Sequence, residues 1–207
     1  MTTLTIDAKM FTDALRRVLP HAAKPGADAP ILANVRFTVR DGWLVVQATD
    51  RYTVGESRIP LSEIDAKATL DVLADAERVK ALVPALRRDK LVMLTDDDDE
   101  VTLSGAYVTP LDTSTIRNWP AVDRLWPTEF GEDVQGPLSL GTATLKKLAA
   151  LPQSAAEGRD EAPTFHAAKP GGPVVVLFGE NTRVLAMPCR VDTDRARARF
   201  GGWHSAA

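Results

Sequence analysis

Histidine, cysteine, a run of carboxylates and clustered basic residues are the side chains of this sequence that could take part in chemistry. The three histidines, His21, His166 and His204, stand without a nearby patterned partner. The sequence holds no nucleophile elbow, P-loop, CxxC, HExxH or glycine-rich dinucleotide motif. We therefore expect no enzyme, no catalytic residue and no cofactor. A triad assembled from distant residues stays open, because order along the chain does not reveal proximity.

The acidic run Asp96-Asp97-Asp98-Asp99-Glu100 is the candidate for a metal site. Consecutive aspartates on an extended chain alternate sides, so their carboxylates do not converge, and the spaced ligands of a calcium loop are missing. We expect no metal there and interpret the run as a turn between strands. Cys189 is the only cysteine, which excludes an intrachain disulfide and favours a reducing, cytoplasmic setting. We expect its thiol to be a small buried hydrophobe.

The number and placement of charged residues indicate whether this protein could bind nucleic acid. The net charge is −3, with 44% hydrophobic and 26% charged residues, which argues against a high-pI binding domain unless the charges are segregated. We find no apolar run of transmembrane length and no secretory signal, so no membrane partner is expected. Basic residues do gather in three predicted helices, where they would contact phosphates without reading sequence; the alternative is ordinary solvation of helix surfaces. They are Lys9, Arg16 and Arg17, then Arg78, Lys80, Arg87 and Arg88 with Lys90 just beyond, and Lys146 and Lys147.

These helices belong to a unit of strand, amphipathic helix and further strands that the chain repeats three times. In the first copy a strand at Leu4 and Ile6 leads to a helix capped by Asp7. Strands over 31–39 and 43–48 follow, joined by the hairpin pair Asp41-Gly42, and a third runs over 51–59. The expected apolar face of the helix consists of Met10, Phe11, Ala14, Leu15 and Val18.

The second copy spans about 68–108, with a strand at Leu70 and Val72, a helix capped by Asp75, and strands over 91–95 and 101–103. Pro84 should kink or split that helix, because proline cannot donate a backbone hydrogen bond. The expected apolar face is Val79, Leu82, Val83 and Leu86.

The third copy opens at 137 with a strand at Leu138 and Leu140, and Thr142 is the expected helix cap. A polar loop over 153–163 precedes strands over 164–167, 174–178 and 183–187. Its inward-facing helix residues are expected to be Leu145, Leu148 and Ala149.

Between the second and third copies two Trp-Pro pairs, Trp119-Pro120 and Trp126-Pro127, indicate an anchored linker. We predict a domain of two units over 1–115, a linker over 116–136, a smaller one-unit domain over 137–192 and a flexible tail over 193–207.

Four stretches resemble the bacterial DNA polymerase III beta sliding clamp and its phage relatives, and this chain looks like a shortened, phage-like member. The resemblance covers most of the chain and implies an α+β DNA-clamp fold, with antiparallel sheets outside a ring and helices inside it. The stretches are Ile31-Leu32-Ala33-Asn34-Val35 continuing through Ala48-Thr49-Asp50-Arg51-Tyr52, the interdomain segment from Trp119-Pro120 to Trp126-Pro127, Leu138-Ser139-Leu140 with Leu145-Lys146-Lys147-Leu148, and the closing run Val184 to Val191 through Met187-Pro188.

The resemblance implies a non-enzymatic processivity factor that encircles double-stranded DNA and serves a polymerase and a clamp loader. Family members have more domains per subunit than this chain, which also continues past the Met-Pro run. Rings of twelve units would need four chains of three units, so a homo-oligomer is expected. A ring of three or two chains stays open if the third copy is fuller than this interpretation makes it. Two alternatives stay open: a clamp-fold adaptor that binds peptides without encircling DNA, and a hydrolase whose site one sequence does not reveal.

The resemblance also implies an apolar groove in which partner proteins dock short peptides. The alternative is that the same residues only seal the domain junction, or that Phe200 and Trp203 of the tail fold back and plug the groove. The matching positions here are Thr49, Arg51, Tyr52, Thr53, Val54, Pro127, Met187, Pro188, Cys189, Arg190 and Val191.

Overall fold

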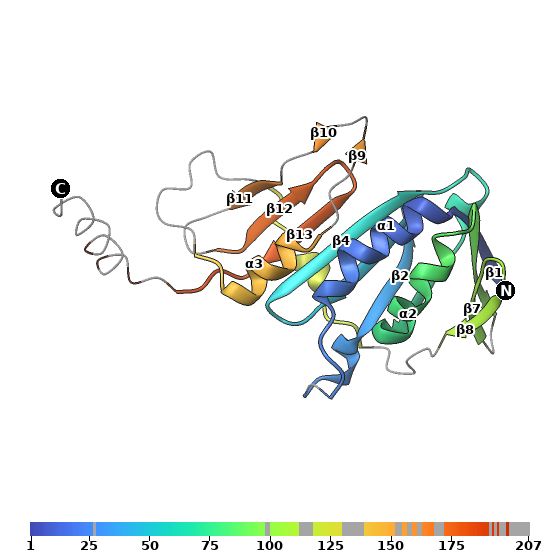
Figure 1. The fold of residues 1–207 in the computed structure, drawn as a ribbon, viewed down its shortest axis with the longest axis horizontal. Helices are drawn as coiled ribbons and strands as arrows, with labels where there is room; N and C mark the ends of the chain where they lie inside the picture. The colour runs from blue at the N-terminus through green and yellow to red at the C-terminus, as the bar shows by residue number, and fades with distance from the viewer. Residues whose placement is uncertain are drawn as a thin grey trace.

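Two large antiparallel sheets, with helices packed against them, make up the fold in the computed structural model (Figure 1). The structure describes residues 1–26, 28–97, 100–111, 118–129, 139–151, 155–156, 159–160, 163–167, 172–190, 192, 194 and 198. Most of the predicted tail, parts of the predicted linker, and Val191 therefore lie outside the described residues.

The first unit follows the predicted order. It comprises β1 (Thr2–Asp7), α1 (Ala8–Val18), the 3-10 turns η1 (Leu19–His21) and η2 (Pro30–Ala33), β2 (Asn34–Arg40), β3 (Trp43–Thr49) and β4 (Thr53–Pro60). The Asp7 carboxylate caps α1 by accepting a hydrogen bond of 2.9 Å from the Met10 backbone N–H, as predicted. Asp41 and Gly42 both have positive φ, which is the backbone of a two-residue hairpin turn.

The second unit comprises η3 (Asp65–Lys67), β5 (Asp71–Asp75), α2 (Ala76–Leu86), β6 (Leu91–Asp97), β7 (Glu100–Ser104) and β8 (Val108–Leu111). Asp75 caps α2 at the Arg78 N–H, as predicted. The prediction that Pro84 splits the helix is wrong. Pro84 lies in the last turn, and α2 continues past it to Leu86. The sequence pattern also gave no sign of β8, which contains Pro110 and forms a sheet edge.

The third unit holds η4 (Val122–Leu125) before it, then α3 (Thr142–Ala149), β11 (Thr164–Ala167), β12 (Val174–Phe178) and β13 (Thr182–Ala186). Two short strands, β9 (Ala155–Ala156) and β10 (Arg159–Asp160), pair within the stretch that was predicted to be a loop. Gly141, not Thr142, precedes α3, and no side chain caps this helix. Ser139 and Leu140 are not in a strand, and Leu138 lies outside the described residues.

The first two units exchange their leading strands. One sheet has the order β1-β6-β7-β8, so β1 of the first unit pairs with β6 of the second. The other has the order β11-β12-β13-β4-β3-β2-β5, so β5 of the second unit pairs with β2 of the first. β13 extends this sheet by pairing with β4, with Leu185 opposite Val54. The predicted larger and smaller domains thus share one seven-stranded sheet.

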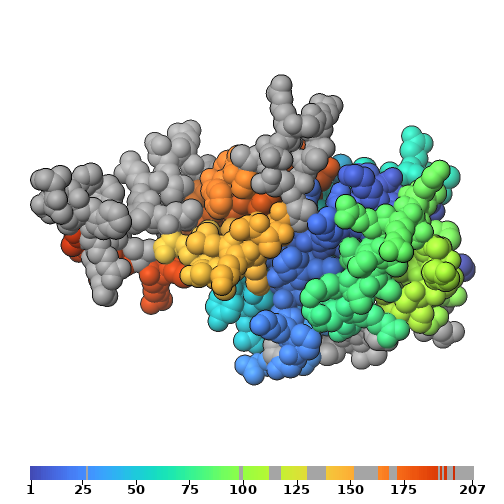
Figure 2. Space-filling model, in the orientation of Figure 1, coloured from blue at the N-terminus to red at the C-terminus, as the bar shows by residue number. Residues whose placement is uncertain are grey.

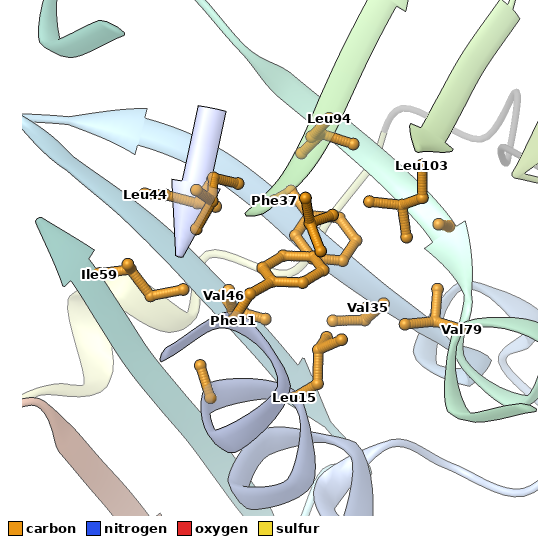
Figure 3. Packing of buried hydrophobic residues seen from close by; sticks show 14 of the residues in the cluster. Phe11, Leu15, Val35, Phe37, Leu44, Val46, Ile59, Val79, Leu94 and Leu103 are labelled. Carbon is orange, nitrogen blue, oxygen red and sulfur yellow. The ribbon is translucent and has the colours of Figure 1, made fainter. Parts of the chain in front are cut away.

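The main hydrophobic core lies between the two sheets and under α1 and α2 (Figure 3). Phe11 of α1 stacks on Phe37 of β2 with ring centroids 5.9 Å apart, and both are fully buried. Met10 was expected on the apolar face but is exposed, because it lies one residue off the stripe that faces the sheets. The core of the third unit is separate and small: Leu148 packs there with residues of β12 and β13. Leu145 and Ala149, also expected inside, are exposed.

Candidate functional site

The helices form one face of the molecule, which we call the helix face. In Figures 1 and 2, α3, α1 and α2 follow one another across the side toward the viewer. Lys9, Arg16, Arg78, Lys80, Arg88 and Lys146 are all exposed on these helices or at their ends, and so are Arg87 and Lys90. The acidic hairpin lies elsewhere: Asp96 pairs with Thr2, at the end of β1 remote from α1.

Several of these cations already have partners. Lys9 pairs with Asp13 at 3.1 Å and Lys80 with Glu77 at 3.2 Å. Such exposed ion pairs within one helix contribute little to stability and leave the cation accessible to a phosphate. Arg17 differs because it is half-buried and donates a 3.1 Å hydrogen bond to the Thr182 hydroxyl of β13. Arg17 therefore links the first unit to the third.

Lys147 was predicted to contact phosphate, but in the structure it forms an ion pair with Asp50. Its ammonium lies 2.5 Å from the Asp50 carboxylate, and both side chains are largely buried. Asp50 begins the turn between β3 and β4 and also accepts hydrogen bonds from Thr53. Burial alone would raise the pKa of Asp50, but the hydrogen bonds from Lys147 and Thr53 outweigh it and lower the pKa. The pair fastens α3 to this turn.

His21 lies beside this ion pair, at the end of η1. The ring is fully buried, and neither of its nitrogens has a hydrogen-bond partner among the residues that the structure describes. Burial, aided by the nearby Lys147 charge and opposed by Asp50, lowers its pKa from 6.5 to about 3. A Cβ built at Gly55 of β4 would come within 2.4 Å of the ring, so only glycine leaves it room. The buried ring packs against Gly55 of β4.

The opposite side of the seven-stranded sheet, which we call the linker face, carries the interdomain segment. In β3, Leu44, Val46 and Ala48 point into the main core, so the alternate residue Gln47 faces away from the helices. Gln47 donates a 2.9 Å hydrogen bond to Asp123 of η4, whose carboxylate also accepts one of 2.9 Å from Arg40. Burial alone would raise the pKa of Asp123, but these bonds and the nearby arginine charges outweigh it and lower the pKa.

Trp126 anchors the end of the same segment. The Arg183 guanidinium of β13 lies 4.0 Å from the centre of its ring, a cation–π contact. Arg183 in turn pairs with Glu56 of β4 at 2.6 Å. Strands of the first and third units therefore hold this segment over 119–126.

An apolar groove opens beside η4 on the linker face. It has a cavity volume of about 260 Å³. Its floor is a small cluster of Val54, Val122 and Leu185, buried where β4 meets β13. Tyr52, Leu125 and Met187 are exposed around it. Such an apolar depression with exposed, adaptable side chains fits the anchor residues of an extended peptide.

The structure brings together some of the residues predicted to bind peptide and not others. Thr49, Arg51, Tyr52, Val54 and Met187 line the groove. Thr53 is buried beneath the turn, and Pro127, Pro188, Cys189 and Arg190 are not among the lining residues. Val191 lies outside the described residues. The lining residues that the sequence did not predict are Ala29, Ile31, Leu32, Pro120, Val122, Leu125 and Leu185.

Some of these additional lining residues belong to motifs that the sequence analysis had already identified. Pro120, Val122 and Leu125 belong to the Trp-Pro segment, and Ile31 and Leu32 open the first family-like stretch.

Three further expectations concern residues outside the groove. Cys189 was expected to be buried, but it is exposed, because the chain after Met187 has left the sheet. Asp98 and Asp99 of the acidic run lie outside the described residues. Within the described part of the chain, no helix has the length and apolarity to cross a membrane.

The fold resembles that of several solved structures of DNA polymerase III beta subunits. The protein superposes on the DNA polymerase III beta subunit of Thermotoga maritima with a TM-score of 0.73 and 15% identity, covering 92% of this chain and 65% of that one. The Borrelia burgdorferi beta subunit gives 0.76 with 11% identity, covering 92% and 65%. The Streptococcus pneumoniae beta chain gives 0.72 with 16% identity, covering 92% and 65%.

The fold is that of the DNA polymerase III beta sliding clamps. At these identities the likeness concerns the fold alone, and the chain spans about two thirds of the length of each clamp. No protein-family description matches the sequence, and no curated protein matches it. The expected α+β clamp fold, with antiparallel sheets and repeated strand–helix–strands units, is confirmed.

Proposed function

We propose that this protein is a sliding-clamp-like processivity factor, a non-enzymatic, cytoplasmic protein that encircles double-stranded DNA in a homo-oligomeric ring. The observation that carries the proposal is the clamp fold with exposed basic side chains along all three helices of its helix face. A sliding protein needs weak phosphate contacts and no base readout, because tight or specific contacts would stop it from moving.

The cations differ in how well they suit this role. Lys9, Lys80, Arg88 and Lys146 are exposed and reach solvent from α1, α2 and α3. Lys147 and Arg17 hold units together, so we assign them a supporting role in shaping the face. The exposed set is the one expected to contact phosphates.

Retention on circular DNA tests encirclement. A ring loaded on a closed circle should stay bound and should slide off once the circle is linearised. The double variant Lys9→Glu and Lys146→Glu should weaken binding and reduce the salt slope by roughly 0.9 for each phosphate that the protein no longer neutralises. The control, Lys24→Glu with Lys67→Glu, makes the same charge change away from the three helices. Equal retention on circular and linear DNA, or a footprint at a preferred sequence, would refute the proposal.

We further propose that the groove on the linker face docks short peptides of the polymerase and the clamp loader. Titration of a fluorescent clamp-binding peptide tests this. Met187→Ala should weaken binding because Met187 lines the groove, whereas Met93→Ala should not. Met93 is equally exposed, at 43% against 44%, but lies on β6. If only a chain truncated after residue 191 binds, the tail plugs the groove; if no form binds, the groove only seals the junction.

A clamp-fold adaptor that binds peptides without encircling DNA is the second candidate. It is favoured by a specific observation: the groove is formed within one chain, while Lys147 is neutralised by Asp50. Light scattering separates the two candidates. A ring requires a stable oligomer, and a monomer that binds peptide but does not stay on circular DNA is an adaptor.

A further inference from the structure

The first two units show what one unit of this fold requires from a neighbour. The leading strand of each unit pairs with the other unit, β1 with β6 and β5 with β2, and both helices contribute to one core. Each unit therefore donates a strand and receives one. The exchange is reciprocal, so two units related by a two-fold axis satisfy each other.

Within the described residues, the third unit has a helix and a three-stranded meander but no such neighbour. Its strand β11, which corresponds to β2 and β6, is an edge strand of the seven-stranded sheet. Its leading residues, Ser139 to Gly141, are not in a strand. The other edge of its meander, β13, is already used by β4. An edge strand presents backbone groups to which a further strand can add.

The side chains at the same position of the three helices also show that the third unit has an uncovered side. The fourth residue of each helix is Phe11 in α1, Val79 in α2 and Leu145 in α3. The first two are fully buried between the units, whereas Leu145 is 48% exposed. An apolar residue at this place in the unit is therefore left in solvent only where no second unit covers it.

Phe165 of β11 repeats the pattern. It pairs with the core residue Val176 of β12, as Phe37 pairs with Val46 and Leu94 with Leu103. Phe37 and Leu94 are fully buried and lie opposite the exchanged strands, but Phe165 is 47% exposed. Together with half-buried Leu140 it lines, beside Leu145, an open apolar groove with a cavity volume of about 370 Å³. These are the positions that an exchanged unit would cover.

We infer that this groove is an interface between two copies of the chain, in which the third unit of one copy completes a clamp-type domain with the third unit of another. Each copy adds Ser139 to Gly141, which precede its α3, to β11 of its partner, and the two α3 helices close one core. The surface is self-complementary, since the same unit carries both the donor and the acceptor of the exchange. The contact extends the proposed ring, which would then hold an even number of chains.

Substitution at the groove tests the interface in the full chain. Leu145→Asp and Phe165→Asp should each reduce the mass in solution by a factor of two or more while leaving the far-UV circular dichroism unchanged, because both side chains are exposed in the single chain. Ile64→Asp, at an apolar residue 85% exposed outside the groove, should keep the mass of the parent. A monomeric parent chain, or groove variants that keep the parent mass, would overturn the inference.

Hydrogen exchange supplies a second measurement on the unmodified protein. Amides of β11 should be protected at high protein concentration and lose protection on dilution, while those of the central strand β3 should not change. Protection of β11 that is independent of concentration means that the chain's own tail or another segment covers it, and the inference fails. An oligomer that dissociates through this groove but slides off circular and linear DNA alike would keep the inference and refute the proposed function.

Discussion

The buried imidazole of His21 makes stability depend on pH above the range in which carboxylates titrate. Its pKa is about 3 in the folded protein against an ordinary value of 6.5. Between these values the unfolded chain binds a proton that the folded protein does not bind. Stability is therefore fully present well above pH 6.5 and falls as the pH is lowered through 6.5 toward 3.

The size of this stability loss follows from the gap between the folded and unfolded pKa values of His21. Well below pH 6.5 each pH unit costs about 1.4 kcal/mol, but near 6.5 the unfolded imidazole is only half protonated and the slope is about half as large. Lowering the pH from 6.5 to 4.5 should therefore remove about 2 kcal/mol of unfolding free energy. That is a sizeable part of the 5–15 kcal/mol, roughly, that holds a typical domain together. Asp50 does not contribute in this window, because its pKa is lowered from 3.8 and its effect on stability begins only at lower pH.

Urea unfolding at pH 7.5, 6.5, 5.5 and 4.5 measures this dependence in the wild type and in His21→Leu. The leucine variant keeps an apolar side chain in the site and removes the titrating group, so its stability should vary much less over the same range. His166→Leu, at a half-buried histidine of β11, is the matched control and should follow the wild type. Equal losses in the wild type and His21→Leu between pH 6.5 and 4.5 would show that the reasoning is wrong.

Three further predictions concern the junction between the units. Gly55→Ala should destabilise the protein by about 1–3 kcal/mol, because its Cβ would overlap the His21 ring; an unchanged urea midpoint would contradict the packing described. Lys147→Met should cost about 1–3 kcal/mol by leaving its carboxylate partner in the β3–β4 turn unpaired, whereas Lys146→Met on the exposed side of α3 should be neutral; equal effects would count against the ion pair. Trp126→Ala should make the linker a faster site of limited proteolysis, and an unchanged cleavage rate would mean that the cation–π contact does not anchor it.

The sequence was most informative about local structure. Asp7 and Asp75 cap their helices as expected, because capping needs only a carboxylate at the right place before an apolar stripe. The turn at Asp41-Gly42 followed from the same kind of local chemistry. The repetition of the unit and its family-like stretches were enough to predict the clamp fold.

The groove could be predicted only in part. Tyr52 and Met187 came from motifs in the chain, but Leu185 and Val122 became groove residues because β13 pairs with β4 and η4 lies across them. No local pattern specifies which distant strand adds to a sheet edge. Lys147 shows the same limit, since its spacing on α3 indicated a solvent-facing cation and only the fold placed Asp50 beside it.

The third unit separates the two kinds of information most clearly. Its sequence specifies an amphipathic helix and a meander, with Leu145 and Phe165 at positions that are typical of a core. Whether such positions are buried depends on a second unit packing against them, since apolar periodicity reports a face to be covered and not what covers it. The sequence alone determined the units, their caps and their turns. Tertiary structure decided which units share a core, and it left the last one with an open side.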